Sequence, residues 1–372
     1  MRVTVVTARF PPMRGGVADH TLAWCRALVE LGGFDLAVVT SPGASQGANT
    51  GDIPVDASQT DWSRAGAAAL RSAVERSKPD VVVIQYVPHA FSRRGGGLPF
   101  ARVLRGLSRS LGVPLVVCGH ELYAPWSEGW HRAPWSLAQR VGVGVLAASS
   151  RALVVTVKAR QERVQAALPR WRDRILVVPN GPTVLPVAPN PRWRAEHGVG
   201  DGLVVLATLG LRHPAKDTAA LEAALTQLEA SDIDARLFVA GGLVVRHPWA
   251  IDLGYVDAAA AGQLLAAADL FVLPLADGAS GRRSSLISAL AAGAAVVSTA
   301  GSDTDPALFP AGALSLTPAG DTGAFASAVE RLAADPGARM ALREGGRALF
   351  EQEFAWPVVA RRWSDILHNA AS

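Results

Sequence analysis

Short apolar runs without polar alternation recur along the first half of the chain. They lie at residues 2–8, 35–40, 81–86, 114–118, 152–157 and 174–178. Such runs are typical of parallel strands that helices cover on both faces. Between them, apolar residues recur at helical spacing over residues 17–31 and 98–111. The pattern predicts strands and helices in alternation.

The second half repeats this alternation. Its predicted strands lie at residues 202–209, 235–240, 269–273, 294–299 and 313–316, and its predicted helices at 215–230, 257–268 and 284–292. Alternating strands and helices form parallel sheets with right-handed crossovers. We therefore expect an α/β fold with two doubly wound, Rossmann-like domains facing a cleft. Ligands bind such folds at the carboxyl ends of the strands.

A proline-rich stretch separates the two series. Five prolines lie between the last predicted strand of the first series and the first strand of the second, at residues 179–191. A linker of this composition is semi-rigid and suits a hinge. We place the N-terminal domain at residues 1–186 and the start of the C-terminal domain at residue 187.

The composition favours a folded, soluble protein. Of the 372 residues, 49% are hydrophobic and 18% charged, which excludes disorder along the whole chain. Cys25 and Cys118 are too few for a disulfide framework and suit a reducing cytoplasm. The uncharged residues 284–302 favour a buried helix and strand over a membrane span. Because the first residues also lack the layout of a signal peptide, we expect a cytoplasmic location.

The charge is unevenly distributed. Residues 1–186 carry 22 Lys+Arg against 12 Asp+Glu, and residues 187–372 carry 14 against 20. The basic half could attract an anionic substrate or make peripheral contact with the inner face of a membrane. A basic face that is only solvated explains the counts equally well. Nucleic acid is not an expected partner, because no RNA-binding or helix-turn-helix motif is present.

Three glycine-containing turns follow predicted strands and precede predicted helices. The first contains Gly15 and Gly16, and the second contains Gly210, Arg212 and Lys216. The third contains Asp277, Gly278, Ser280, Gly281, Arg282, Arg283 and Ser284. Glycine lets a ligand approach the backbone, and the start of a helix favours anions, so these turns predict phosphate binding. Each turn alone could serve geometry or carry ordinary surface charge.

His120 follows a predicted strand, at an end that would face the ligand. A single histidine is as often structural as functional. The spacing of His, Cys, Asp and Glu residues matches no metal site, so we predict none. Tryptophans and prolines are concentrated at residues 123–135, where they could line an acceptor site, touch a membrane interface or pin a loop.

With these residues, the chain resembles the GT-B-fold glycosyltransferases and is most similar to the retaining enzymes of family 4 (GT4). The motifs that carry the resemblance are FPPMRGG at residues 10–16, VPNG at 178–181, GLRHPAK at 210–216, DLGYV at 252–256 and FAW at 354–356. The resemblance implies that the C-terminal domain ends at residue 354 and that a helix over residues 355–372 packs back on the N-terminal domain. It also implies a nucleotide-diphosphate sugar as co-substrate and no bound cofactor.

One motif of the family is altered. Its usual EX7E motif has two glutamates eight residues apart, and the corresponding positions here are Ser280 and Ser288. The second glutamate normally holds the nucleotide ribose, so Ser288 would make a weaker contact. The segment around Ser280 keeps glycine turns and adds Arg282 and Arg283.

The resemblance implies glycosyl transfer with retention of anomeric configuration, by front-face attack that the leaving phosphate assists. Lys216 and Arg212 would stabilise the leaving diphosphate without a metal, with Arg282 or Arg283 helping. His120 would contact the sugar or the acceptor. One alternative is a sugar-nucleotide 2-epimerase. Another is a non-catalytic GT-B protein that binds a nucleotide or a partner transferase. The sugar, base, acceptor and oligomeric state stay open.

Overall fold

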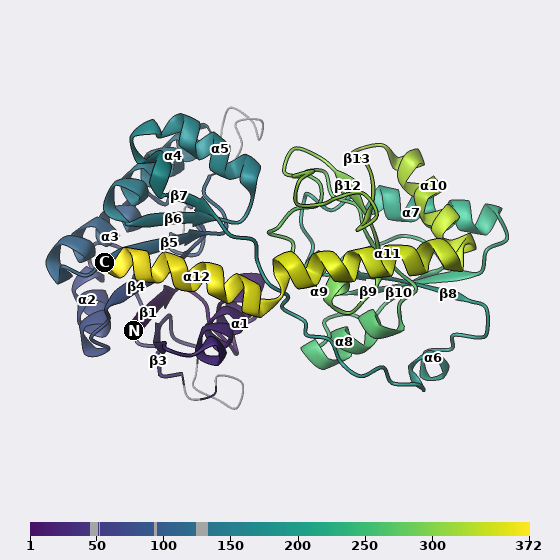
Figure 1. Ribbon diagram of the computed structural model, residues 1–372, viewed down its shortest axis with the longest axis horizontal. Coiled ribbons are helices and arrows are strands. Elements are labelled where there is room, and N and C mark those ends of the chain that lie inside the picture. The colour runs from purple at the N-terminus through teal and green to yellow at the C-terminus, as the bar shows by residue number, and fades with distance from the viewer. Residues whose placement is uncertain (45–50, 52, 93–94, 124–132) are drawn as a thin grey trace. The chain divides into compact units, whose positions relative to one another are not determined.

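The computed structural model describes residues 1–44, 51, 53–92, 95–123 and 133–372 (Figure 1). The chain divides into two compact units. The first consists of Met1–Pro179 and Val359–Ser372, and the second consists of Asn180–Val358.

The first unit is built on a parallel sheet of seven strands in the order β3-β2-β1-β4-β5-β6-β7. The strands are β1 (Arg2–Thr7), β2 (Asp35–Val39), β3 (Val55–Asp56), β4 (Val81–Tyr86), β5 (Leu115–Gly119), β6 (Ala152–Val155) and β7 (Ile175–Val177). All residues of β4, β5 and β6 are buried, as the continuous apolar runs predict.

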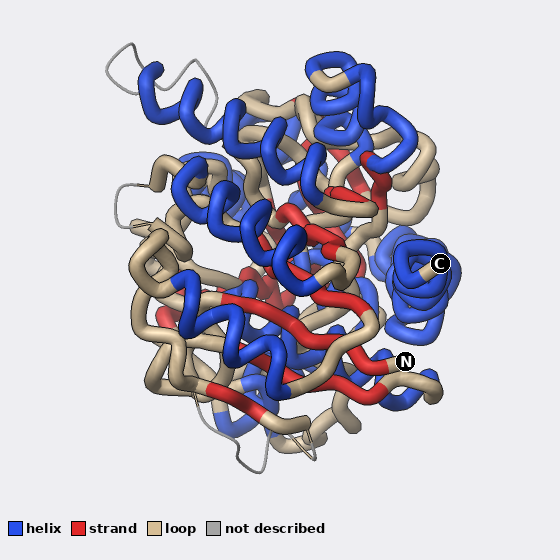
Figure 2. The backbone as a smooth tube through the Cα atoms, turned by 90° about the vertical axis from the view of Figure 1, so that its left-hand side faces the viewer, coloured by secondary structure: helices blue, strands red, loops and turns tan. Residues whose placement is uncertain are grey.

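Helices pack on both faces of this sheet. The helices of the first unit are α1 (Gly16–Leu31), α2 (Ala67–Arg76), α3 (Leu98–Leu111), α4 (Ala133–Ser149), α5 (Lys158–Ala167) and the 3-10 helix η3 (Pro169–Arg174). Figure 2 shows α2, α3 and α4 side by side on one face. Their apolar side chains share one core with the strands. On α1, Trp24 meets Trp363 of the last helix edge to face, with ring centroids 5.3 Å apart.

The second unit repeats the plan with a parallel sheet of six strands in the order β10-β9-β8-β11-β12-β13. The strands are β8 (Val204–Leu209), β9 (Ala235–Ala240), β10 (Ala250–Asp252), β11 (Leu270–Leu273), β12 (Ala295–Ala300) and β13 (Ser315–Pro318). Its helices are α6 (Trp193–Glu196), α7 (Thr218–Ala230), α8 (Ala258–Ala267), α9 (Ser284–Ala291), α10 (Thr322–Ala334), α11 (Pro336–Leu349) and the π-helix η4 (Phe350–Phe354). One core contains α8 and α9 residues and another contains α7 and α10 residues.

The predicted fold class, two α/β units with parallel sheets, is confirmed. Residues 284–302 form α9 and β12, as expected. The sequence analysis did not find β3 and β10, because strands of two and three residues are too short to show a pattern. It also did not predict α2, α4, α10 and α11, or α5, on which Val164 is the buried residue and no apolar face exists.

The structure divides the chain after Pro179, not after residue 186 as we predicted. Hydrogen bonds explain the difference, because the linker is tied to the second unit. The Asn180 amide donates to the Gly281 carbonyl at 2.7 Å, and the Trp356 indole donates to the Pro182 carbonyl at 3.0 Å. At the other end, α12 (Trp356–Ala371) begins in the second unit and continues as part of the first.

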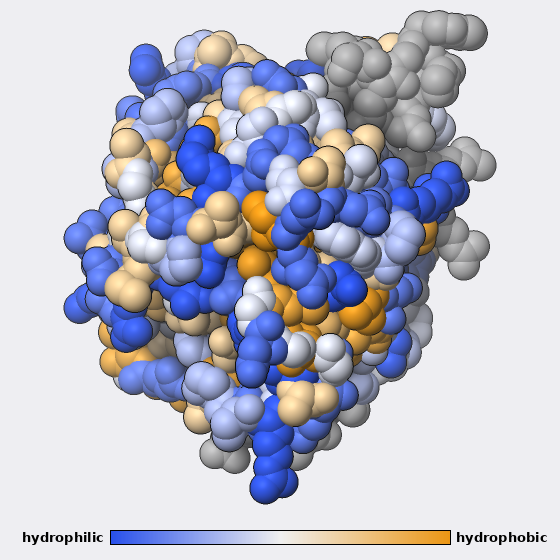
Figure 3. All heavy atoms as spheres, turned by 90° about the vertical axis from the view of Figure 1, so that its right-hand side faces the viewer, coloured by the Kyte–Doolittle hydropathy of each residue, from blue (hydrophilic) through white to orange (hydrophobic). Residues whose placement is uncertain are grey.

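Figure 3 shows one face of the molecule, where hydrophilic side chains predominate and apolar residues gather in smaller patches. Among the residues that the structure describes, none of the helices combines the length and hydrophobicity needed to cross a bilayer.

Candidate functional site

Strands β8 and β11 are neighbours, and the turns that follow them lie together at one edge of the second sheet. The turn after β8 begins at Gly210, whose backbone φ of +113° suits glycine. A Cβ atom at Gly210 would lie 2.6 Å from the Nζ atom of Lys216. The absence of a side chain at Gly210 therefore makes room for the lysine ammonium group.

Lys216 is fixed in this turn by its own backbone and side chain. Its ammonium donates to the Leu209 carbonyl at 2.8 Å, and its backbone pairs with Leu275 in the turn after β11. Burial, with the positive charge of Arg283 as a second cause, lowers the pKa of Lys216 to about 8. The ammonium group is therefore both partly buried and close to a second positive charge.

Arg212 lies in the same turn but is not part of this arrangement. Its side chain is exposed, and it makes no ion pair or hydrogen bond to any residue that the structure describes. The predicted pair of cations is thus one fixed lysine and one arginine on the surface of the loop.

The turn after β11 holds two arginines on one carboxylate. The guanidinium groups of Arg282 and Arg283 both donate to Asp277, one to each carboxylate oxygen. Burial raises the pKa of Asp277, but Arg283 and Arg282 outweigh it, and the net shift is downward. Both arginine side chains are nearly buried, with 12% and 11% exposed. The three side chains form a rigid group with one more positive than negative charge.

Asp303 is a member of this group that the sequence analysis missed. It is 4% exposed, and one of its carboxylate oxygens lies 3.6 Å from the Nε atom of Arg282. Its backbone amide donates to the Asp277 carbonyl at 2.9 Å. Its place in the sequence, shortly after the apolar run of β12, is the signal from which Asp303 could have been predicted as a site residue. We name Lys216, Asp277, Arg282, Arg283 and Asp303 the cation cluster; its three positive charges exceed its two negative ones.

Gly278 fixes the backbone beneath the cation cluster. Its φ is +83°, and a Cβ atom there would lie 2.2 Å from both the Gly301 nitrogen and the Thr304 hydroxyl. The Thr304 hydroxyl also accepts the Gly301 amide at 3.0 Å. The turn after β11 is therefore packed against the loop after β12, and no other residue fits at position 278.

The cation cluster adjoins the start of α9. Arg283 is the residue before this helix, Ser284 is its first residue, and the first-turn amides have no carbonyl partner within the helix. Ser280 is 1% exposed, and its hydroxyl oxygen has no hydrogen-bond partner among the described residues. Gly281, the next residue, is also buried, and its carbonyl oxygen accepts a hydrogen bond from the Asn180 amide. A helix start next to excess positive charge is a suitable site for an anion.

Ser288 lies within α9 and contacts the linker. It is completely buried, and its hydroxyl oxygen accepts hydrogen bonds from the backbone amides of Thr183 and Val184, at 3.2 and 3.1 Å. This serine fixes the linker on α9. Because its hydroxyl is enclosed, it offers no surface to a ribose.

In the first unit, Gly15 and Gly16 form the start of α1. Gly15 precedes the helix and its carbonyl accepts the Asp19 amide at 3.0 Å, while Gly16 is exposed. A Cβ atom at Gly16 would meet nothing within 4 Å. The turn is therefore open enough for a ligand to approach the first amides of α1.

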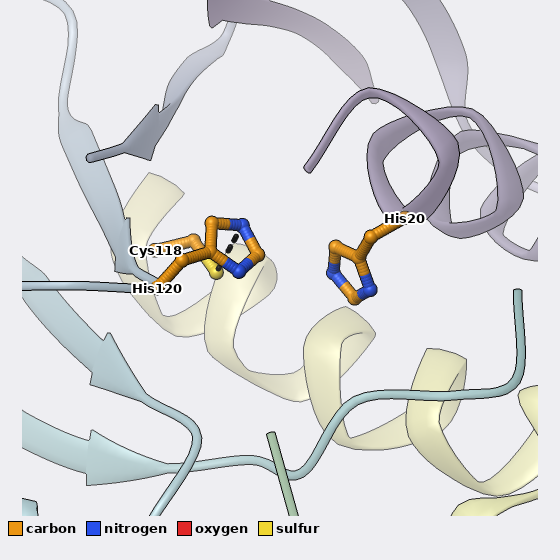
Figure 4. Close-up of side chains that lie close together, drawn as sticks. All are labelled: His20, Cys118 and His120. Atoms are coloured by element: carbon orange, nitrogen blue, oxygen red, sulfur yellow. Dashed lines mark hydrogen bonds between the residues drawn. The ribbon is translucent and has the colours of Figure 1, made fainter. Parts of the chain in front are cut away.

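His120 lies one residue beyond β5, where it meets His20 of α1 (Figure 4). The two rings are edge to face with centroids 4.9 Å apart. The Nε2 atom of His120 lies 2.7 Å from Oε1 of Gln85 and 3.7 Å from Sγ of Cys118. Burial lowers the pKa of His120 to about 4. The imidazole is therefore neutral at physiological pH, and Gln85 fixes its orientation.

This histidine pair was not foreseen. One ligand atom from each of His20, Cys118 and His120 lies within 4.8 Å of the others, although the linear spacing predicted no metal site. Burial raises the pKa of the Cys118 thiol to about 12, and burial with His120 lowers that of His20 well below its usual value. All three groups are thus held in their uncharged forms. Of the tryptophan-rich segment, residues 124–132 lie outside the described residues.

Two families account for most of the chain. Residues 15–181 match the glycosyl transferase 4-like domain, and residues 202–335 match the glycosyl transferases group 1 domain. Together with the two Rossmann-like parallel sheets, these matches identify the chain as a glycosyltransferase of the GT-B fold. More particularly, the chain belongs with the GT4-like glycosyltransferases. No curated protein matches the sequence.

Solved structures show the same fold. Anabaena HepE in complex with UDP and glucose is similar with a TM-score of 0.74 and 16% identity, over 99% of each chain. Sucrose-phosphate synthase from Thermosynechococcus elongatus has a TM-score of 0.75 and 16% identity, over 99% of this chain and 98% of its own. A glycosyltransferase from Rickettsia africae has a TM-score of 0.69 and 13% identity, over 99% and 98%.

Proposed function

We propose that the protein transfers a glycosyl group from a nucleotide-diphosphate sugar to an acceptor, with retention of anomeric configuration and without a metal. The observation that carries the proposal is the cation cluster beside the start of α9. It lies at the carboxyl ends of β8 and β11, where parallel α/β sheets bind ligands. HepE, which shares the fold, was crystallised with UDP and with UDP-glucose, so UDP-sugars are the first donors to test.

The charges of the cluster suit a leaving diphosphate. Lys216 contributes the positive charge that Asp277 and Asp303 do not balance, and its pKa is lowered first by burial and second by the nearby charge of Arg283. A phosphate oxygen placed between Lys216 and the first amides of α9 would restore the balance. Because these donors are fixed before the substrate arrives, they would stabilise the charge that develops as the glycosidic bond breaks. Arg212 would reach the same phosphates from the exposed part of its turn.

The contacts that the nearby carboxylates make with arginines support retention of anomeric configuration. Asp277 is held by two arginines, and Asp303 lies against one of them. Neither is available as the nucleophile that a double displacement needs. Attack from the front face, with the leaving phosphate accepting the acceptor's proton, requires no such carboxylate.

In the first unit, we assign His120 to a substrate hydroxyl. With its Nε2 atom donating to Gln85, the Nδ1 atom is left as an acceptor. A neutral imidazole in this tautomer accepts a hydrogen bond from a sugar or acceptor hydroxyl and so orients it. The open turn at Gly15 and Gly16 would admit a phosphate or sugar to the start of α1.

The test is a donor panel. UDP-, GDP-, ADP- and dTDP-sugars are added to the full chain, and thermal shift and nucleotide release are measured with and without EDTA. We expect one nucleotide to raise the melting temperature and its sugar conjugate to release nucleotide when an acceptor is present, equally with EDTA. Proton NMR of the product gives the anomeric configuration. Inversion would overturn retention, and loss of turnover in EDTA would overturn metal independence.

A non-catalytic GT-B protein is the second candidate, because the EX7E positions carry Ser280 and Ser288, both buried. Donor binding without release under any acceptor would favour it. Conversion of the sugar without an acceptor would instead indicate a 2-epimerase. Lys216→Met serves as the control, because it removes the charge assigned to phosphate binding.

A further inference from the structure

Helix α4 exposes a continuous apolar face. Leu137 and Val141 are 56% and 48% exposed, and Pro134 and Ala148 are exposed on the same side. Their spacings of three, four and seven residues place them on one stripe of an α-helix. Trp135, 43% exposed, borders the stripe at the start of the helix. Among the described residues, nothing covers these side chains.

Helix α3 packs beside α4 on the same face of the sheet (Figure 2). Its outer face carries three exposed arginines, Arg102, Arg105 and Arg109. None of them makes an ion pair with a described residue. Neither helix contains an aspartate or a glutamate. An apolar stripe and an unneutralised row of positive charges are therefore exposed on adjacent helices.

We propose that the outer faces of α3 and α4 dock on an anionic lipid surface. Exposed apolar side chains in a continuous patch mark an interaction site, and an amphipathic helix with arginines binds in the interfacial layer of a membrane. Arginine side chains can extend toward lipid phosphates while their aliphatic parts stay on apolar surface. The tryptophan at the helix start suits the same layer. The excess of 22 basic over 12 acidic residues in residues 1–186 adds attraction at longer range.

This surface lies on α3 and α4, whereas the residues assigned to substrate binding belong to the second unit, to the start of α1 and to His120 at the end of β5. Membrane docking and glycosyl transfer can therefore fail independently in experiments.

The test is co-sedimentation of the full chain with vesicles of phosphatidylcholine alone or mixed equally with phosphatidylglycerol. We expect binding to the mixed vesicles at low salt, weaker binding at high salt, and little binding to phosphatidylcholine alone. The double variant Leu137→Ser/Val141→Ser should weaken binding at least about tenfold. Each of Arg102→Gln, Arg105→Gln and Arg109→Gln should weaken it about fivefold at low salt.

Matched controls change exposed residues elsewhere. Val29→Ser/Met340→Ser replaces side chains that are 47% and 63% exposed, and Arg331→Gln removes an exposed arginine from α10. These variants should bind vesicles as the unchanged chain does. Thermal shift with the donor nucleotide should stay the same in all variants, which shows that they are folded.

Two results would overturn the proposal. One is failure of the unchanged chain to bind mixed vesicles at low salt. The other is vesicle binding that the α4 double variant leaves intact. If sedimentation equilibrium then shows a dimer that this double variant dissociates, the apolar face binds a second copy of the chain instead of lipid.

Discussion

Lys216 and Arg283 place two positive charges close together, and the guanidinium adds to burial in lowering the pKa of Lys216 to about 8. Asp277 holds Arg283 in place, so the arginine cannot move away from the ammonium group. Like charges held together in this way favour an anionic ligand, which relieves their repulsion.

Affinity for the nucleotide diphosphate should decrease as the pH rises through about 8. Lys216 binds the phosphates only while it is protonated, and its pKa in the free protein is about 8. The dissociation constant for UDP, measured by calorimetry between about pH 7 and about pH 9.5, should rise accordingly. Lys216→Arg keeps its charge in this range and should remove most of the dependence. An unchanged dissociation constant across the range would contradict the assignment of Lys216.

Lys216→Met should stabilise the protein near pH 7 while it weakens donor binding. The pKa of Lys216 falls from 10.5 to about 8 on folding, so the folded protein binds its proton less tightly. This cost is fully present below about pH 8 and disappears as the pH rises to 10.5. The variant's melting temperature should therefore exceed that of the unchanged chain at pH 7 and approach it near pH 10.5. The control Lys158→Met, on the exposed start of α5, should change neither property.

Asp277→Asn should destabilise the second unit. It leaves the nearly buried guanidinium groups of Arg282 and Arg283 without their shared carboxylate. Loss of one partner in such a group costs about 3 kcal/mol in the free energy of unfolding, measured by urea denaturation. Asp234→Asn removes an exposed ion pair with Arg236 and should cost less than about 1 kcal/mol. Equal effects of the two substitutions would show that the cluster contributes no more than a surface pair.

Gly278→Ala should be far more damaging than Gly293→Ala. Both glycines have positive φ, +83° and +74°, so both substitutions carry backbone strain of about 1 kcal/mol. Only at Gly278 would the added Cβ also meet backbone, 2.2 Å from the Gly301 nitrogen, whereas nothing lies within 4 Å at Gly293. We expect Gly278→Ala to displace the turn that carries Arg282 and Arg283 and to abolish donor-induced thermal shift. A normal shift in this variant would show that the turn does not hold the donor.

The first unit should lose stability in acid through its buried histidines. Burial lowers the pKa of His120 to about 4 and, with His120, lowers that of His20. The contribution of His120 is present above the unfolded pKa of 6.5 and is lost as the pH falls toward about 4, and the contribution of His20 is lost in the same direction. The free energy of unfolding should fall by up to about 1.4 kcal/mol per pH unit for His120 in this range. His120→Asn should flatten the dependence, and a variant with an unchanged slope would place the acid sensitivity elsewhere.

The sequence predicted the two parallel sheets because a strand that is buried on both faces appears in the sequence as an uninterrupted apolar run. The runs at β4, β5 and β6 are apolar without interruption, and each lies under helices on both sides. The same reasoning located the turns after β8 and β11, because a glycine between a strand and a helix is visible in the linear order. It failed at α5, where ten largely polar residues form a helix with one buried side chain, and it also left out α2, α4, α10 and α11.

By itself, then, the sequence determined the fold class and the turns at the strand ends that carry Lys216, Arg282 and Arg283. Only the tertiary structure decided which of these groups meet. It placed Asp303 against Arg282, enclosed Ser288 under the linker, left Arg212 exposed and brought His20 to His120. These relationships depend on contacts between residues far apart in the chain. Burial and charge at such contacts are set by how strands and helices pack, which no local pattern of residues encodes.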